Sequence, residues 1–93
     1  MNNDLPAAVT AFFLTDGFGS VIDIQPVVGG LINQTCRVTT SAKVSFILKQ
    51  NAASPDRLFE CEAAGLHMLS QVGMRTPKVW AVGADFLLLE DLG

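Results

Sequence analysis

Hydrophobic positions follow a helical period at the start of the chain. Asp4 is an N-cap type residue ahead of Pro6, and proline is tolerated in a first helical turn. The apolar residues that recur at helical spacing are Leu5, Val9, Phe12 and Phe13. The pattern predicts a short amphipathic helix that ends near Asp16-Gly17.

Short β-branched runs separated by turn residues follow, and they predict strands. Residues 21–28 form the first run, in which Pro26 cannot donate to a ladder, so we expect an edge or bulged strand. Gly29-Gly30 breaks this run, and residues 35–40 resume the β character.

Residues 44–50 are predicted to form a third strand after a turn at Ser41-Ala42. Because side chains alternate along a strand, one face carries Val44, Phe46 and Leu48, and the other carries Ser45, Ile47 and Lys49. The second face is therefore expected to be apolar except for one cation.

A long helix is predicted from Asp56, as its cap, to Val72, with Gly73 as the closing residue. The residues expected to line one side of it are Leu58, Glu62, Leu66 and Leu69. Glu60 projects to the opposite side with His67, so Glu62 is the inward carboxylate.

Two further strands are predicted at residues 79–82 and 86–89, beyond Pro77. The order of elements predicts an α+β fold: a five-stranded antiparallel sheet, one long helix packed on it and a short N-terminal helix. The 93 residues are enough for a single domain, residues 1–93.

Lys49 and Glu62 place two opposite charges at positions that the periodicity assigns to the interior. A charge removed from water is costly unless it is paired and hydrogen-bonded, so we expect Lys49 to reach Glu62. The structural alternative is an ion pair without function, or a Lys49 that extends to water along its methylene groups.

Composition and charge exclude several classes of partner. Nine acidic and six basic residues give a net charge of −3, and Lys and Arg form no basic stripe, so we predict neither nucleic-acid nor membrane binding. The apolar runs are shorter than the roughly 20 residues of a membrane span. Residues 1–6 lack the basic start of a signal peptide, so we expect a cytoplasmic protein.

Four residues with possible chemistry are interpreted as structural. Cys36 and Cys61 have no CxxC spacing and no histidine cluster nearby, so we predict neither a metal site nor a disulfide and expect both to be packing residues. His67 is expected to be a solvated surface residue, and Trp80 a core residue.

The mean hydropathy of +0.39 is high for a small domain. An exposed apolar strand can pair with a strand of another chain. We therefore expect a homodimer through an exposed apolar edge at Phe86 to Leu89.

The segment VVGGLINQT places a glycine turn between two strands. Glycines let backbone N–H groups approach phosphate oxygens without obstruction by a Cβ atom. The same Gly-Gly pair would serve a plain hairpin equally well. The candidate phosphate-binding residues are Gly29, Gly30, Leu31, Ile32 and Asn33.

Five segments together resemble the N-terminal lobe of the fructosamine (ketosamine) kinase family, within the aminoglycoside-phosphotransferase and protein kinase-like fold. They are VVGGLINQTCRV, SFILKQN, RLFECEAAGLHML, RTPKVWAVG and FLLLEDLG, in the order of the family. The GG-x-IN loop and the FE-x-E helix favour fructosamine kinases over antibiotic phosphotransferases.

The resemblance implies an ATP site with Mg²⁺. The glycine loop would lie over the phosphates, Lys49 would contact the α- and β-phosphates, and Glu62 would orient Lys49. The backbone around Glu90 to Leu92 would hydrogen-bond adenine. The residues implied to wall the base are Val28, Val38, Ile47 and Leu89.

The resemblance also implies that the catalytic residues and the metal ligands belong to a C-terminal lobe absent from these 93 residues. We therefore expect an ATP-binding lobe, inactive alone, of an enzyme that phosphorylates the sugar of a ketosamine small molecule or glycated protein. The alternatives are a lobe of an aminoglycoside or homoserine kinase-like phosphotransferase, and a stand-alone, non-catalytic nucleotide-binding or interaction module.

Overall fold

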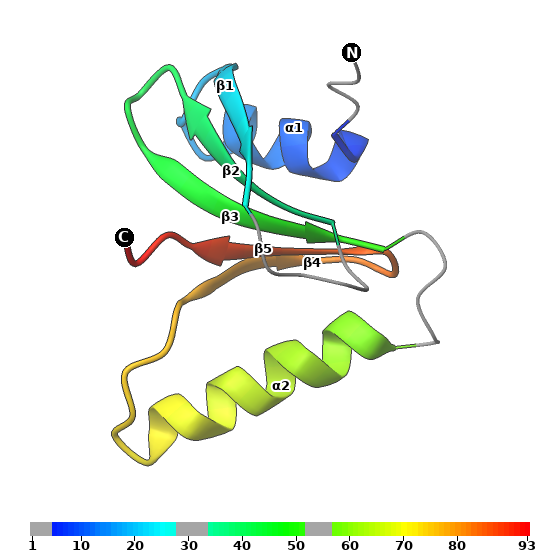
Figure 1. The fold of residues 1–93 in the computed structure, drawn as a ribbon, viewed down its shortest axis with the longest axis vertical. Helices are drawn as coiled ribbons and strands as arrows, with labels where there is room; N and C mark the ends of the chain where they lie inside the picture. Colours follow the sequence, from blue (N-terminus) through cyan, green and yellow to red (C-terminus); the bar gives the residue numbers. More distant parts are fainter. Residues whose placement is uncertain (1–4, 28–33, 52–56) are drawn as a thin grey trace.

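The computed structural model describes residues 5–27, 34–51 and 57–93. The elements are α1 (Ala7–Thr15), β1 (Val21–Pro26), β2 (Gln34–Thr40), β3 (Ser45–Gln50), α2 (Leu58–Gln71), β4 (Val79–Val82) and β5 (Phe86–Glu90) (Figure 1). The predicted α+β fold, with five antiparallel strands, a short first helix and a long second one, is confirmed.

The strands form one sheet in the order β1-β2-β3-β5-β4, and every neighbouring pair is antiparallel. β1 lies at one edge, and its pairing with β2 is irregular between Val21 and Asp23. The expected edge or bulged first strand is therefore confirmed. β4 lies at the other edge.

The expectation that Phe86 to Leu89 form an exposed edge is wrong. β5 lies between β3 and β4, and all four of these residues are buried. Phe86 and Leu88 pack on one face of the sheet, and Leu87 and Leu89 pack on the other. An uninterrupted apolar run is typical of a strand covered on both faces, so strand exchange through this segment is not available in the sheet.

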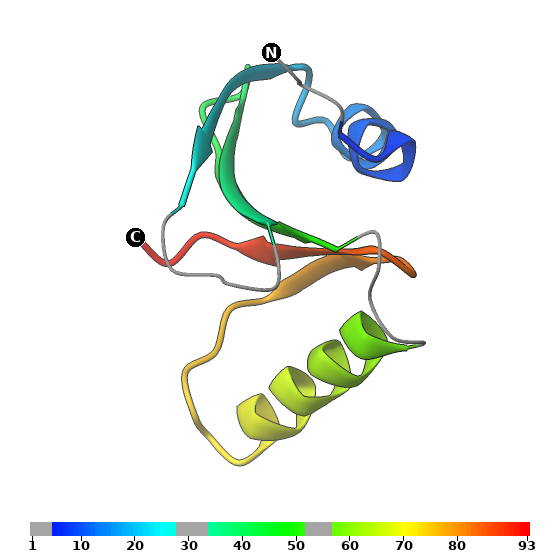
Figure 2. The same ribbon diagram turned by 45° about the vertical axis from the view of Figure 1, so that its right-hand side comes forward.

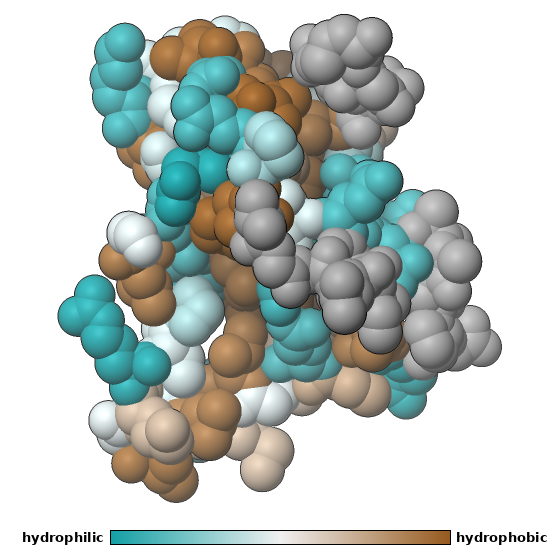
Figure 3. All heavy atoms as spheres, in the orientation of Figure 1, coloured by the Kyte–Doolittle hydropathy of each residue, from teal (hydrophilic) through white to brown (hydrophobic). Residues whose placement is uncertain are grey.

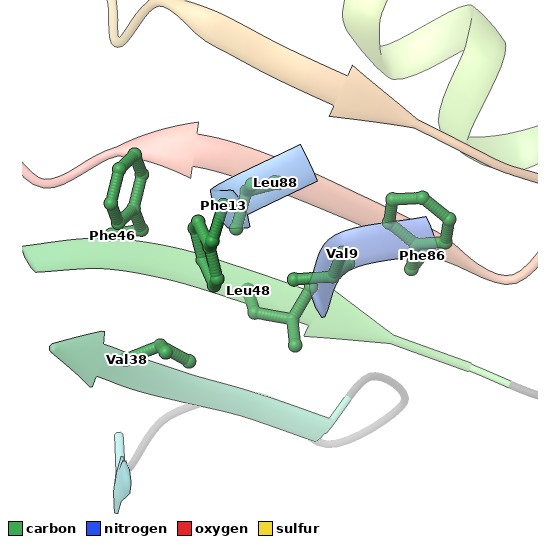
Figure 4. Packing of buried hydrophobic residues seen from close by; sticks show 7 residues of the cluster. All are labelled: Val9, Phe13, Val38, Phe46, Leu48, Phe86 and Leu88. Carbon is green, nitrogen blue, oxygen red and sulfur yellow. The ribbon is translucent and has the colours of Figure 1, made fainter. Parts of the chain in front are cut away.

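α1 covers one face of the sheet, and α2 lies on the other (Figure 2). The core beneath α1 consists of Val9, Phe13, Val38, Phe46, Leu48, Phe86 and Leu88. Figure 4 shows Val9 and Phe13 directed from α1 toward side chains of β3 and β5. Phe46 contacts the rings of Phe13 and Phe18, with centroid distances of 4.8 and 5.0 Å.

Trp80 belongs to the same core, as predicted. Its ring lies 5.9 Å from that of Phe46 and 5.7 Å from that of Phe18. The Lys78 ammonium lies 3.9 Å from the Trp80 ring centroid, which is within cation–π range. Trp80 therefore joins the edge strand β4 to the core beneath α1.

α2 packs on the sheet mainly through its first turns. Phe59 is fully buried against Leu87 and Leu89. Farther along, Met68 is 70% exposed and Val72 is 75% exposed. Apolar side chains consequently gather on the surface at the far end of this helix (Figure 3).

The sequence correctly predicts the C-terminal end of α2 but not its N-terminal cap. Gly73 follows the helix with a φ of +87°, which confirms the predicted C-terminal signal. At the start, Arg57 rather than Asp56 occupies the N-cap, with a left-handed backbone and no capping hydrogen bond from its side chain. Asp4, Asp56, Val28 and residues 29–33 lie outside the described part of the chain.

The two cysteines differ in their surroundings. Cys36 is half-buried against the α1 core, and this burial raises the pKa of its thiol. Cys61 is exposed, so the expectation that it packs is wrong, because it precedes the sheet-facing Glu62 by one residue on α2. His67 is exposed as expected, and its ring lies 3.0 Å from the side-chain amide of Gln71.

Neither of the described helices is long and apolar enough to span a membrane.

Candidate functional site

Three cross-strand rows of side chains share the face of the sheet that α2 packs against. The rows, here called the Lys49 face, are Thr35–Lys49–Leu87, Arg37–Ile47–Leu89 and Thr39–Ser45. Their alternate neighbours, such as Cys36, Phe46 and Leu88, point toward α1. Period-two alternation thus separates the side chains of three strands into an apolar face and a face that carries charges.

Lys49 and Glu62 meet on this face. The Lys49 Nζ atom donates a hydrogen bond of 2.6 Å to Glu62 Oε2, and each side chain is 30% exposed. The pairing expected from the sequence is confirmed, although both groups retain contact with water instead of lying inside the core. A charge-assisted hydrogen bond of this kind holds the ammonium in one place.

The helix row that contains Glu62 explains why this carboxylate, and not Glu60, reaches the strand. Leu58 and Leu66, four residues to either side, are partly buried against the Leu87–Leu89 cluster. Glu60 instead accepts a hydrogen bond of 3.1 Å from Arg57 in solvent. The assignments of Glu62 to the inward side and Glu60 to the outward side are therefore correct, whereas Leu69, expected in the inward row, is 41% exposed.

Two of the four residues expected to wall a nucleotide base lie together. Ile47 and Leu89 are opposite each other on β3 and β5, on the Lys49 face. Val38 is fully buried beneath α1, so its assignment to the same wall is wrong. Its register partner is Phe46 rather than Ile47, which places it on the other face. Val28 lies outside the described residues.

The last residue of β5 is hydrogen-bonded to the residue that precedes β4. The Glu90 N–H donates to the Lys78 carbonyl at 2.8 Å, and the Lys78 N–H donates to Glu90 Oε1 at 3.0 Å. The Glu90 N–H is thus engaged within the sheet. Leu92, the other residue expected to contribute its backbone, is 44% exposed.

A second ion pair on the Lys49 face was not predicted from the sequence. Arg37 Nε donates to Asp91 Oδ2 at 2.7 Å, and the Gly93 N–H donates to Asp91 Oδ1 at 3.0 Å. The Arg37 hydrogen bond, followed by that of Gly93, lowers the pKa of the Asp91 carboxyl. The interval of two from Leu87 and Leu89 to Asp91 indicates the face on which Asp91 lies, but it does not indicate its partner.

The candidate phosphate loop, residues 29–33, lies outside the described part of the chain, but its flanks are described. The Val27 N–H donates to the Thr35 carbonyl at 2.9 Å, and Thr35 is opposite Lys49. The chain therefore leaves β1 and re-enters the sheet beside the Lys49 position.

A shallow groove of about 460 Å³ runs along α2 beside the ion pair, lined by Glu62, Gly65, Leu66, Met68 and Leu69. Within residues 5–27, 34–51 and 57–93, no three His, Cys, Asp or Glu side chains are grouped so as to hold a metal ion. The Lys49 ammonium, which is 30% exposed, suits an anionic ligand.

A family model for fructosamine kinase matches residues 9–92. No curated protein and no solved structure matches the chain. The matched range begins within α1 and includes Lys49, Glu62 and the segment that follows β5.

Proposed function

Since the chain belongs to the fructosamine kinase family, we propose that it is the ATP-binding N-terminal lobe of an enzyme that transfers phosphate from ATP to the sugar of ketosamines. The sequence resemblance to this family is confirmed by the match to residues 9–92. The five-stranded antiparallel sheet with its two helices is compatible with a kinase-like N-terminal lobe.

The Lys49–Glu62 ion pair is the observation that carries the proposal. An ammonium group has several N–H donors, and the 2.6 Å bond to Glu62 uses one of them. The others can donate to phosphate oxygens while Glu62 keeps the lysine in place. In kinases a strand lysine held by a helix glutamate performs this function for the nucleotide phosphates.

The neighbouring row supports a place for the base. Ile47 and Leu89 lie one step along the strands from Lys49 and Leu87, on the same face. In the proposal the phosphates lie beside Lys49, the base lies beside Ile47, and the backbone around residues 90–92 bonds to the base edge. The loop of residues 29–33 would cover the phosphates from the β1–β2 side.

The acceptor is proposed from the family and not from the described residues: a small ketosamine or a glycated protein. Phosphoryl transfer also requires a base for the acceptor hydroxyl and ligands for Mg²⁺. The carboxylates described on the Lys49 face, Glu62 and Asp91, are both engaged by basic side chains. We therefore propose that the 93 residues bind ATP without transferring its phosphate, in a cytoplasmic setting where ATP is available.

Titration of ATP into the 93-residue chain tests the binding part of the proposal. We expect saturable binding by calorimetry or NMR, and loss of most of it in Lys49→Met, because the phosphates lose their cation. Lys43→Met is the matched control: it removes the same charge from the exposed turn before β3 and should bind ATP like the unaltered chain.

Two outcomes would contradict the proposal. Absence of ATP binding by the unaltered chain, with a folded structure by circular dichroism, would favour an interaction module without a nucleotide. Turnover of a ketosamine by the 93 residues alone, measured as ADP release, would contradict the expected lack of phosphate transfer.

A further inference from the structure

The Arg37–Asp91 ion pair joins parts of the sheet that are not neighbours. Arg37 lies on β2, and Asp91 directly follows β5, while β3 separates these two strands. A contact of 2.7 Å between them requires the arginine side chain to cross β3 on one face. That face is the Lys49 face, because Arg37 is in register with Ile47.

Asp91 makes the hydrogen bonds that join the segment after β5 to the sheet. Among the described residues, strand pairing ends at Glu90. Beyond it, both carboxylate oxygens of Asp91 are engaged, one by Arg37 and the other by the Gly93 N–H. The Asp91 side chain thus connects the backbone of residue 93 to Arg37 on β2.

Stability alone gives little reason for such a pair. Arg37 is 38% exposed, and ion pairs with this degree of exposure contribute about 1 kcal/mol or less because water screens them. The pair does, however, link the segment that contains Leu92 to the strand row that contains Ile47. The affinity of a ligand that contacts both Leu92 and Ile47 would depend on this link.

We propose that the Arg37–Asp91 ion pair positions the segment after β5 for the base of the bound nucleotide, so that it sets affinity for adenosine and not for the phosphates. This inference rests on the proposed function and adds a positioning residue, Arg37, that acts through Asp91. Arg37 has no assigned contact with the ligand.

Adenosine and inorganic tripolyphosphate are the probes, because each represents one half of ATP. We expect Arg37→Ala and Asp91→Asn each to weaken adenosine binding by about five-fold, the upper end of what a partly exposed ion pair contributes. Tripolyphosphate binding should be unchanged. Asn at position 91 still accepts the Gly93 N–H bond, so this variant isolates the link to Arg37.

The two substitutions change the net charge in opposite directions. A general electrostatic effect would therefore move their affinities for the anionic tripolyphosphate apart and would leave uncharged adenosine unaffected, whereas loss of the pair lowers both affinities for adenosine. The double variant should bind adenosine as each single variant does, because the same interaction is removed only once. Arg75→Ala, at an exposed position after α2, is the control for removal of an arginine charge and should bind like the unaltered chain.

The outcomes separate the two proposals. If the unaltered chain binds ATP but Asp91→Asn binds adenosine normally, the ion pair does not position the base segment and the inference is wrong, while the proposed function stands. If adenosine and tripolyphosphate weaken together in both variants, Arg37 has a general structural role and the inference is also wrong. If the unaltered chain binds neither probe nor ATP, the proposed function fails and the inference fails with it.

Discussion

The two faces of the sheet are built from the same strands but stabilised differently. The face beneath α1 holds a cluster of seven buried apolar residues, in which aromatic rings meet around Phe46. The Lys49 face has a smaller buried cluster of three, Phe59, Leu87 and Leu89, and two ion pairs that remain in contact with water. Apolar burial on the first face leaves the second free to keep charged groups accessible to a ligand.

Substitutions at two adjacent residues of β3 should give the largest difference in unfolding free energy between the two faces. Leu48 is fully buried beneath α1, and Lys49 is 30% exposed on the other face. We expect Leu48→Ala to lower the free energy of unfolding by about 2–5 kcal/mol, because it removes buried methyl groups and leaves a cavity. Lys49→Ala should lower it by about 1 kcal/mol or less. Urea denaturation followed by circular dichroism measures both.

Leu48→Val keeps this comparison measurable if Leu48→Ala does not fold. It removes a single methylene group, so a loss of about 1 kcal/mol is expected at the buried position. A larger loss for Lys49→Ala than for Leu48→Val would contradict the comparison. The Lys49 face would then be the one that stabilises the fold.

The sequence predicted most of what depends on local periodicity. The alternation in β3 separated Phe46 from Lys49, and the helical spacing in α2 separated Glu62 from Glu60; both assignments hold in the structure. Turn and proline signals located the strand ends, and Gly73 located the end of α2. These features are encoded within a few residues of the chain.

The errors concern relations between strands. The apolar run at residues 86–89 does not indicate which strands lie beside it, so its place between β3 and β4 was not predicted. Val38 was assigned to the wrong face because its register with Phe46 depends on the β2–β3 pairing. The Arg37–Asp91 pair joins residues far apart in sequence and across a third strand. None of these follows from local pattern alone.

The turn that fastens α1 over its face provides a second, smaller test. Gly17 and Gly19 have φ values of +82° and +87°, which a side chain disfavours by about 1–2 kcal/mol. A Cβ atom at Gly17 would meet open space, but one at Gly19 would collide with Ser41 Oγ. That oxygen accepts a hydrogen bond of 3.1 Å from the Ser20 N–H.

We therefore expect Gly19→Ala to lower the free energy of unfolding by about 2–3 kcal/mol and Gly17→Ala by about 1 kcal/mol. Thermal denaturation of the two variants measures the difference. Gly17→Ala serves as the control, because it has the backbone strain without the collision. Equal losses would show that Ser41 moves aside at little cost and that this turn does not fix α1 closely.

The smallest expected effect is the pH dependence that the Arg37–Asp91 pair on the Lys49 face gives to the free energy of unfolding. Arg37 lowers the pKa of Asp91 in the folded state, so the unfolded chain binds this proton more readily than the folded chain does. The pair therefore stabilises the fold above the unfolded pKa of about 3.9, and its contribution is lost as the pH falls through the folded value. Because Arg37 is 38% exposed, this contribution should be about 0.5 kcal/mol.

Asp91→Asn isolates that contribution. The difference in unfolding free energy between the unaltered chain and this variant should be constant from about pH 5 to 7 and should shrink below about pH 4, where the carboxyl becomes protonated in the unfolded chain. Leu48→Val, within the apolar core beneath α1, should show a loss independent of pH over the same range. A constant difference for Asp91→Asn down to acidic pH would mean that the carboxylate does not stabilise the fold through Arg37, and the charged face would then contribute only to ligand binding.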